Sequence, residues 1–79
     1  PQALVNAKVP SHKKEKYIDY PEIADAIAEL DRKFAGEGRV LIRPSGTEPL
    51  VRVMIEGKDK RQIDGEARKL AELIQNIML

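Results

Sequence analysis

The sequence predicts a small α+β domain in which two helices cover one face of a mainly antiparallel sheet. Three observations favour this fold class. Two stretches carry apolar residues at helical spacing, short runs alternate with a period of two, and glycine or proline separates the segments. A chain of 79 residues has room for one modest core, so we expect residues 1–79 to form a single domain.

The first strand is expected from Leu4 to Val9, where Val5, Ala7 and Val9 share one face. Proline has no amide hydrogen to give to a strand ladder, so Pro10 ends this strand. Leu4, Asn6 and Lys8 share the other face.

A polar and basic connection follows at residues 11–16. Its simplest interpretation is a solvated loop, and a basic guard beside an anion site is the less favoured one. Residues 16–19 also allow a short additional strand. His12 is the only histidine and the chain has no cysteine, so we expect no metal site in this chain.

The first helix is expected to begin at Pro21, a residue favoured in the first turn, with Asp19 as a possible cap. Gly36 and Gly38 supply stop signals after it. Four residues draw one apolar stripe along this helix: Ile23, Ile27, Leu30 and Phe34. In so short a chain, the stripe is more simply core than a surface for a partner.

The second and third strands are expected at residues 39–43 and 50–56, paired as a hairpin. Matching the buried faces places two residues of the second strand, Val40 and Ile42, beside Val51 and Val53 of the third. The third strand alternates cleanly, and its inward face is apolar: Val51, Val53 and Ile55.

The same pairing brings two arginines out on the opposite face, Arg43 where the second strand ends and Arg52 where the third begins. We infer that two guanidinium groups converge beside the connecting loop. Leu41 and Met54 share this outer face, and apolar residues there indicate a neighbouring domain or a further strand.

Asp59 is expected to cap the last helix, with Gln62 completing a pattern like a capping box. Gly65 costs about 1 kcal/mol relative to alanine in a helix interior, and close packing is one explanation for it. The apolar stripe of this helix consists of Ile63, Ala67, Leu70, Ile74 and Ile77, with Leu73 and Met78 beside it.

The loop at residues 43–49, Arg-Pro-Ser-Gly-Thr-Glu-Pro, carries the groups that a phosphate needs. Arg43 offers a planar fork that matches phosphate oxygens, and Ser45 and Thr47 can donate hydroxyl protons. Gly46 lets its amide approach an anion closely and tolerates a positive φ. A plain turn is the alternative, because Pro, Ser, Gly and Thr are ordinary turn residues.

This heptapeptide, with Leu50-Val51-Arg52-Val53-Met54-Ile55-Glu56 after it, resembles the phosphate-binding loop of the α-D-phosphohexomutases, and most closely that of the phosphoglucosamine mutase family. The opening residues 2–6 are also similar to the start of the last domain in that family. The resemblance implies a fragment of a four-domain enzyme, with a C-terminal domain fold related to the TATA-binding protein.

The resemblance also implies a share in the interconversion of glucosamine 6-phosphate and glucosamine 1-phosphate. By the family motif, four residues grip the phosphate that is not transferred: Arg43, Ser45, Gly46 and Thr47. Arg52 follows the pattern as a weaker candidate, and a strand-edge surface charge is its alternative role. Glu48 is expected to orient Arg43 or to cap the loop.

The family uses a phosphoserine and Mg²⁺ in its first domain, and neither motif occurs in this sequence. We therefore expect no catalytic residue here: Ser45 has no histidine near it in sequence, and Glu48 is the single carboxylate of the loop. The expected partners are the phosphosugar and the other domains of the same enzyme. A phosphomannomutase or phosphoglucomutase is the neighbouring alternative.

Charge and composition argue against a nucleic-acid-binding or membrane protein. Fourteen basic residues oppose 13 acidic ones, for a net charge of +1, and there is no aromatic stacking platform. No signal peptide opens the chain and no apolar run is long enough for a membrane helix, so we expect a cytoplasmic protein. A non-enzymatic module that binds nucleic acid or protein on its sheet is the remaining alternative.

Overall fold

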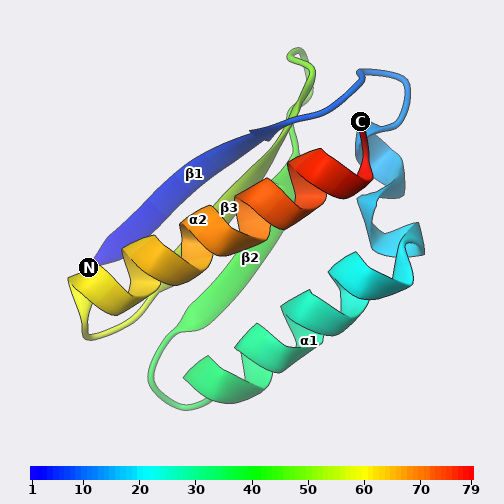
Figure 1. Cartoon of the computed structure of the whole chain (residues 1–79). Coiled ribbons are helices and arrows are strands. Elements are labelled where there is room, and N and C mark those ends of the chain that lie inside the picture. The colour runs from blue at the N-terminus through cyan, green and yellow to red at the C-terminus, as the bar shows by residue number, and fades with distance from the viewer.

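The expected α+β fold class is confirmed by the computed structural model, which describes residues 1–79 (Figure 1). The elements are three strands, two α-helices and a short 3₁₀ helix that the sequence did not predict. In chain order they are β1 (Gln2–Lys8), η1 (Lys14–Asp19), α1 (Pro21–Phe34), β2 (Arg39–Pro44), β3 (Leu50–Glu56) and α2 (Lys60–Ile77). The additional strand considered at residues 16–19 is wrong, because that segment belongs to η1.

The sheet is wholly antiparallel, with β3 in the centre and β1 and β2 at its sides. The hairpin register differs from the expected one by two residues, because Val40 faces Ile55 and Ile42 faces Val53. A shift of two keeps every side chain on its predicted face, whereas a shift of one would reverse them all. The predicted inner and outer faces are therefore correct.

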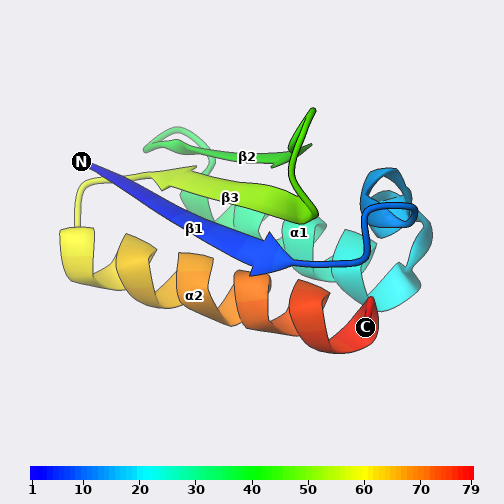
Figure 2. The same cartoon turned by 90° about the horizontal axis from the view of Figure 1, so that it is seen from above.

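Both helices lie on one face of the sheet and leave the other face uncovered (Figure 2). Helix α2 packs against β1 and β3, whereas α1 packs against β2 and α2. The core lies between the two layers, and the inner residues of β3 are fully buried within it. It contains Ala3, Ala7, Val9, Ile23, Phe34, Val51, Val53, Ile55, Ile63, Ala67, Leu70, Ala71, Ile74 and Met78.

Helix α1 begins at Pro21, as predicted, but no side chain caps it. Tyr20 occupies the cap position, and Asp19 ends η1 instead, so the expected cap at Asp19 is wrong. Gly36 follows the helix with a φ of 81°, a conformation that favours glycine.

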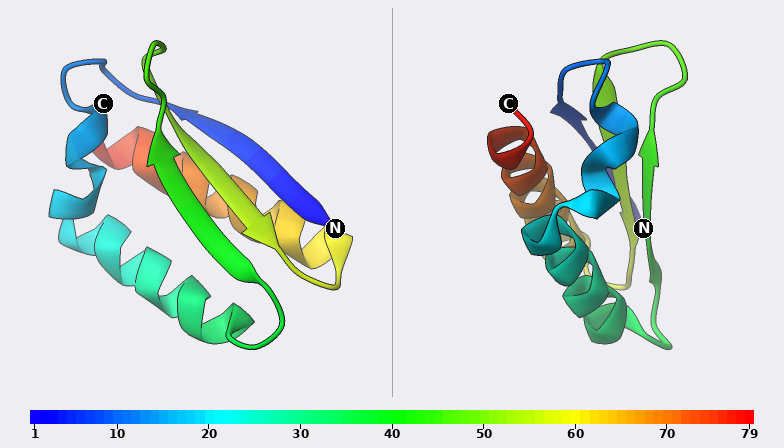
Figure 3. Two further views of the ribbon diagram at one scale, coloured as in Figure 1. Left: turned by 180° about the vertical axis from the view of Figure 1, so that it is seen from behind. Right: turned by 90° about the vertical axis from the view of Figure 1, so that its right-hand side faces the viewer.

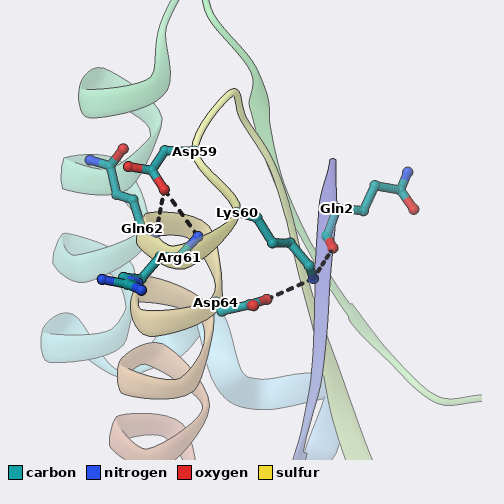
Figure 4. A network of polar contacts seen from close by, with 6 residues as sticks. All are labelled: Gln2, Asp59, Lys60, Arg61, Gln62 and Asp64. Atoms are coloured by element: carbon teal, nitrogen blue, oxygen red, sulfur yellow. Dashed lines mark hydrogen bonds and ion pairs between the residues drawn. The ribbon is translucent and has the colours of Figure 1, made fainter.

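Helix α2 starts at the predicted cap (Figure 4). The Asp59 carboxylate accepts hydrogen bonds from the amides of Arg61 at 3.0 Å and Gln62 at 3.2 Å. The Lys60 ammonium donates to Asp64 at 2.9 Å and to the Gln2 carbonyl at 2.8 Å. The first turn of α2 is thereby joined to the start of β1.

Gly65 has no packing reason to be glycine. A Cβ at this position would meet no atom of another element within 4 Å. Close packing, the explanation considered from the sequence, is therefore wrong. None of the helices combines the length and the apolar character that crossing a membrane requires.

Candidate functional site

The loop between β2 and β3 projects beyond the sheet at the end away from the N-terminus (Figure 3). Two backbone bonds shape it: the Ser45 amide donates to the Leu50 carbonyl at 3.0 Å, and the Leu50 amide donates to the Glu48 carbonyl at 2.8 Å. The Ser45 side chain is buried, and its Oγ accepts from the amides of Thr47 at 3.4 Å and Glu48 at 3.1 Å. Ser45 therefore organises the loop from inside.

Gly46 does not need the positive φ that the sequence suggested. Gly36 alone has a positive φ in this chain, and a Cβ on Gly46 would meet nothing within 4 Å. Gly46 and Thr47 are both exposed at the tip of the loop. The Gly46 backbone is thus open to approach from outside the chain, as an anion-binding amide requires.

Arg43 and Arg52 face each other directly across β2 and β3, so the predicted convergence of two guanidinium-bearing residues is correct. Arg43 is exposed and takes part in none of the ion pairs of the chain. Like charges placed opposite each other on a sheet destabilise it. An anion bound between these two side chains would relieve that repulsion.

Glu48 interacts with Arg52 and not with Arg43, the arginine expected from the sequence. Its Oε1 lies 3.7 Å from Nη2 of Arg52, and both side chains are substantially exposed. An exposed pair at this separation is worth at most about 1 kcal/mol. The expectation that Glu48 orients Arg43 is therefore wrong, and Arg52 is only weakly neutralised.

A shallow depression of about 240 Å³ lies on the outer face of the sheet beside the arginine pair. Its lining mixes polar and apolar side chains: Gln2, Leu4, Leu41, Arg43, Arg52 and Met54. Leu4 is 62% exposed and Leu41 is 45% exposed. The apolar outer face predicted from the sequence is confirmed, and it adjoins the candidate site.

Lys14 contradicts the favoured interpretation of residues 11–16 as a solvated loop, because only 8% of its surface is exposed. Its position agrees better with the less favoured interpretation, a basic guard beside an anion site. Its ammonium donates to the Glu48 carbonyl at 3.1 Å. The available signal was the spacing of Lys14 and Tyr17, because residues three apart share one side of a 3₁₀ helix. His12, by contrast, is exposed as expected.

The opposite end of the sheet carries a separate polar cluster. The Arg39 guanidinium and the Gln2 amide bond to the Glu56 carboxylate, and they hold its pKa below the ordinary value. No group of three or more histidine, cysteine, aspartate or glutamate side chains gathers closely enough to hold a metal ion.

The sequence matches the family described as "Phosphoglucomutase/phosphomannomutase, C-terminal domain" over residues 4–73. It is 61% identical over 75 residues to phosphoglucosamine mutase from Clostridium kluyveri, and 56% identical over 75 residues to that from Clostridium acetobutylicum. Each of these matches covers 95% of this chain but only 17% of the relative.

A similar solved structure is that of Aspergillus fumigatus N-acetylphosphoglucosamine mutase, in complex with GlcNAc-6P and magnesium. The two chains superpose with a TM-score of 0.77 at 26% identity, over 100% of this chain and 16% of the other. Agreement in sequence and in fold leads to one assignment. The chain belongs to the phosphoglucomutase and phosphomannomutase C-terminal domain family.

Proposed function

We propose that these residues are the C-terminal domain of a phosphoglucosamine mutase, and that its loop binds the substrate phosphate that is not transferred. The relatives with 56–61% identity carry that enzyme name. The proposed binding residues are Arg43, Ser45, Gly46, Thr47 and Arg52. In this proposal Ser45 shapes the loop, and the other four residues contact the phosphate.

The observation that carries this proposal is the arginine pair. Arg43 and Arg52 face each other across two strands, with no carboxylate closer than the weak 3.7 Å contact from Glu48. A phosphate dianion supplies the missing negative charge and accepts bidentate hydrogen bonds from guanidinium groups. The exposed Gly46 backbone and Thr47 hydroxyl add uncharged donors at the loop tip.

Such a site contributes to catalysis without touching the reacting bond. Contacts with a remote phosphate provide binding energy that positions the reacting phosphate. A site made of guanidinium groups, hydroxyls and amides recognises phosphate rather than one carbon of the sugar. It can therefore hold either end of a hexosamine phosphate, as interconversion of the 6-phosphate and the 1-phosphate requires.

The chemical step belongs, in this proposal, to other parts of the enzyme. The carboxylates of this chain do not gather into a site that fits Mg²⁺, and the buried Ser45 hydroxyl is engaged with loop amides. We therefore assign no transfer step to this chain. The fungal neighbour, whose structure contains GlcNAc-6P and magnesium, is consistent with a hexosamine phosphate as the substrate and with Mg²⁺ in the complete enzyme.

The family description also covers phosphoglucomutases and phosphomannomutases. Comparing kcat/KM of the intact enzyme for glucosamine 1-phosphate, glucose 1-phosphate and mannose 1-phosphate distinguishes the three. We expect the glucosamine derivative to be preferred, because the close relatives are phosphoglucosamine mutases. A cytoplasmic location remains part of this proposal.

The loop is tested by replacing Arg43 with alanine in the intact enzyme. We expect kcat/KM to fall at least about tenfold, or about 1.4 kcal/mol, because a charge-assisted contact with the phosphate is lost. Arg39→Ala is the matched control: it removes an exposed arginine from the same strand, at the end away from the loop. Its kcat/KM should remain within about twofold of the native value.

If kcat/KM fell equally in Arg43→Ala and Arg39→Ala, the arginines of β2 would act only through overall charge or through folding. An unchanged kcat/KM in Arg43→Ala would remove Arg43 from the site and leave the proposal without its main contact.

A further inference from the structure

Lys14 is a buried cation without a carboxylate partner. Only 8% of its surface is exposed, and it takes part in none of the ion pairs of the chain. Its ammonium has three N–H donors, and the one protein acceptor bonded to it is the Glu48 carbonyl at 3.1 Å. A loop carbonyl, rather than a carboxylate, is therefore the bonding partner of this ammonium in the chain.

The surroundings of Lys14 join its segment to both ends of the phosphate loop. The Val9 amide donates to the Pro49 carbonyl at 3.1 Å, at the end of the loop that leads into β3. The Tyr17 hydroxyl donates to the Ile42 carbonyl at 3.2 Å, in the strand that leads into the loop. Lys14 lies between these two contacts in the sequence and bonds within the loop itself.

The bond from Lys14 has a direct electrostatic consequence for an anion. A backbone carbonyl oxygen repels phosphate oxygens, so a loop that binds phosphate must keep its carbonyls turned away. The Lys14 ammonium holds the Glu48 carbonyl, while the amide of Glu48 is held by Ser45 Oγ. Both sides of this residue are fixed before any ligand arrives, which lowers the entropy lost on binding.

We propose that Lys14 is a positioning residue of the phosphate site, and that its ammonium holds the Glu48 carbonyl turned away from the bound phosphate. This inference rests on the proposed function of the loop. It assigns a role in phosphate binding to the connection after β1, which lies outside both the family motif and the strands.

The test titrates the chain with inorganic phosphate and follows the amide signals of residues 43–52 by NMR. Lys14→Met should raise the dissociation constant at least about tenfold, because a hydrogen bond to a charged group is lost. The matched control is Lys16→Met, which removes an exposed lysine of the same η1 helix. It should change the dissociation constant by less than about twofold.

A rescue variant separates charge from packing. Lys14→Arg keeps the positive charge and several donors, so its dissociation constant should lie within about threefold of the native value. If the methionine variant does not fold, Lys14→Gln, which is polar but uncharged, replaces it in the comparison. Failure of both to fold would overturn the proposal, because Lys14 would then be required by the fold alone.

Arg43→Ala distinguishes this inference from the proposed function. If Arg43→Ala abolishes phosphate binding and Lys14→Met leaves it unchanged, the role of Lys14 is wrong and the loop keeps its function. If phosphate fails to shift residues 43–52 even in the native chain, the proposed function and the role of Lys14 fall together.

Discussion

Arg43 and Ser45 lie two residues apart, but the structure gives them different roles. Ser45 is buried and holds the amides of Thr47 and Glu48 through its Oγ. Arg43 is exposed and faces Arg52 rather than a carboxylate. One side chain stabilises the shape of the loop and the other is free for a ligand, so their loss should affect stability and binding separately.

Glu56 provides a test of electrostatics at the opposite end of the sheet. Hydrogen bonds from Arg39 and Gln2 hold its pKa below the ordinary value. A lowered carboxyl pKa adds stability above the unfolded-state pKa, and this stability is lost as the pH falls through the folded-state value. Arg39→Met should therefore raise the Glu56 pKa and lower stability at neutral pH, with a smaller difference in acid.

The measurement is an NMR titration of the Glu56 carboxyl carbon, together with thermal unfolding at pH 7 and pH 3. Arg52→Met serves as the control, because Arg52 pairs with Glu48 and not with Glu56. Superimposable Glu56 titration curves in the native chain and Arg39→Met would contradict the assigned cause.

We predict opposite changes in stability when alanine replaces two glycines, one within α2 and one just before β2. Gly65 lies inside α2, where a Cβ would meet nothing within 4 Å, so Gly65→Ala should stabilise the chain by about 1 kcal/mol. A Cβ on Gly38, just before β2, would lie 1.9 Å from the Glu56 carbonyl oxygen. Backbone atoms at that point would have to move, so Gly38→Ala should destabilise by about 1–3 kcal/mol.

Denaturant unfolding of the two variants checks this pair, and each serves as the control for the other. A stability change of the same sign in both would show that open space around the Cβ does not govern the outcome.

The hairpin shows what alternation in a sequence determines and what it leaves undetermined. The period of two predicted correctly that Leu41 and Met54 share the outer face, and that Arg43 and Arg52 project together. It did not determine which inner residues are opposite one another, because registers two residues apart bury the same faces. The backbone bond between Ser45 and Leu50 sets the loop length, and hence the register.

Lys14 shows the limit of composition as a guide at the scale of an element. Three lysines stand close together at residues 13–16, and their chemistry is identical. Only the path of the chain through η1 makes one of them buried while Lys16 stays exposed. The lysine that contacts the loop is therefore identified only by its tertiary contacts, whereas the loop itself is evident from its residue types.

At the scale of the whole molecule, the two-layer arrangement separates stability from binding. The helices bury the inner face of β3, and the loop projects from the end of the same strand (Figures 2 and 3). The outer face keeps Leu4 and Leu41 exposed beside the arginine pair. The sequence predicted this layering, because helical stripes and strand alternation both require a shared core.

The central strand should therefore determine the stability of the whole chain. Ile55 is fully buried between the layers, and Ile55→Ala should cost about 2–5 kcal/mol through lost burial and a residual cavity. A domain of this length is stable by only about 4–12 kcal/mol, so this substitution removes a large share of the total stability. Leu41→Ala is the matched control, because its side chain is 45% exposed on the uncovered face. It should cost less than about 1 kcal/mol.

Urea unfolding followed by circular dichroism and by NMR measures both variants, and the two methods should agree if the chain unfolds in one step. The loop is attached to β3, so its amide signals should be lost together with those of the core in Ile55→Ala. If the loop signals vanished at a lower urea concentration than those of β3, the loop would be a separate unit. If Leu41→Ala proved as costly as Ile55→Ala, the outer face would be as important to folding as the buried one.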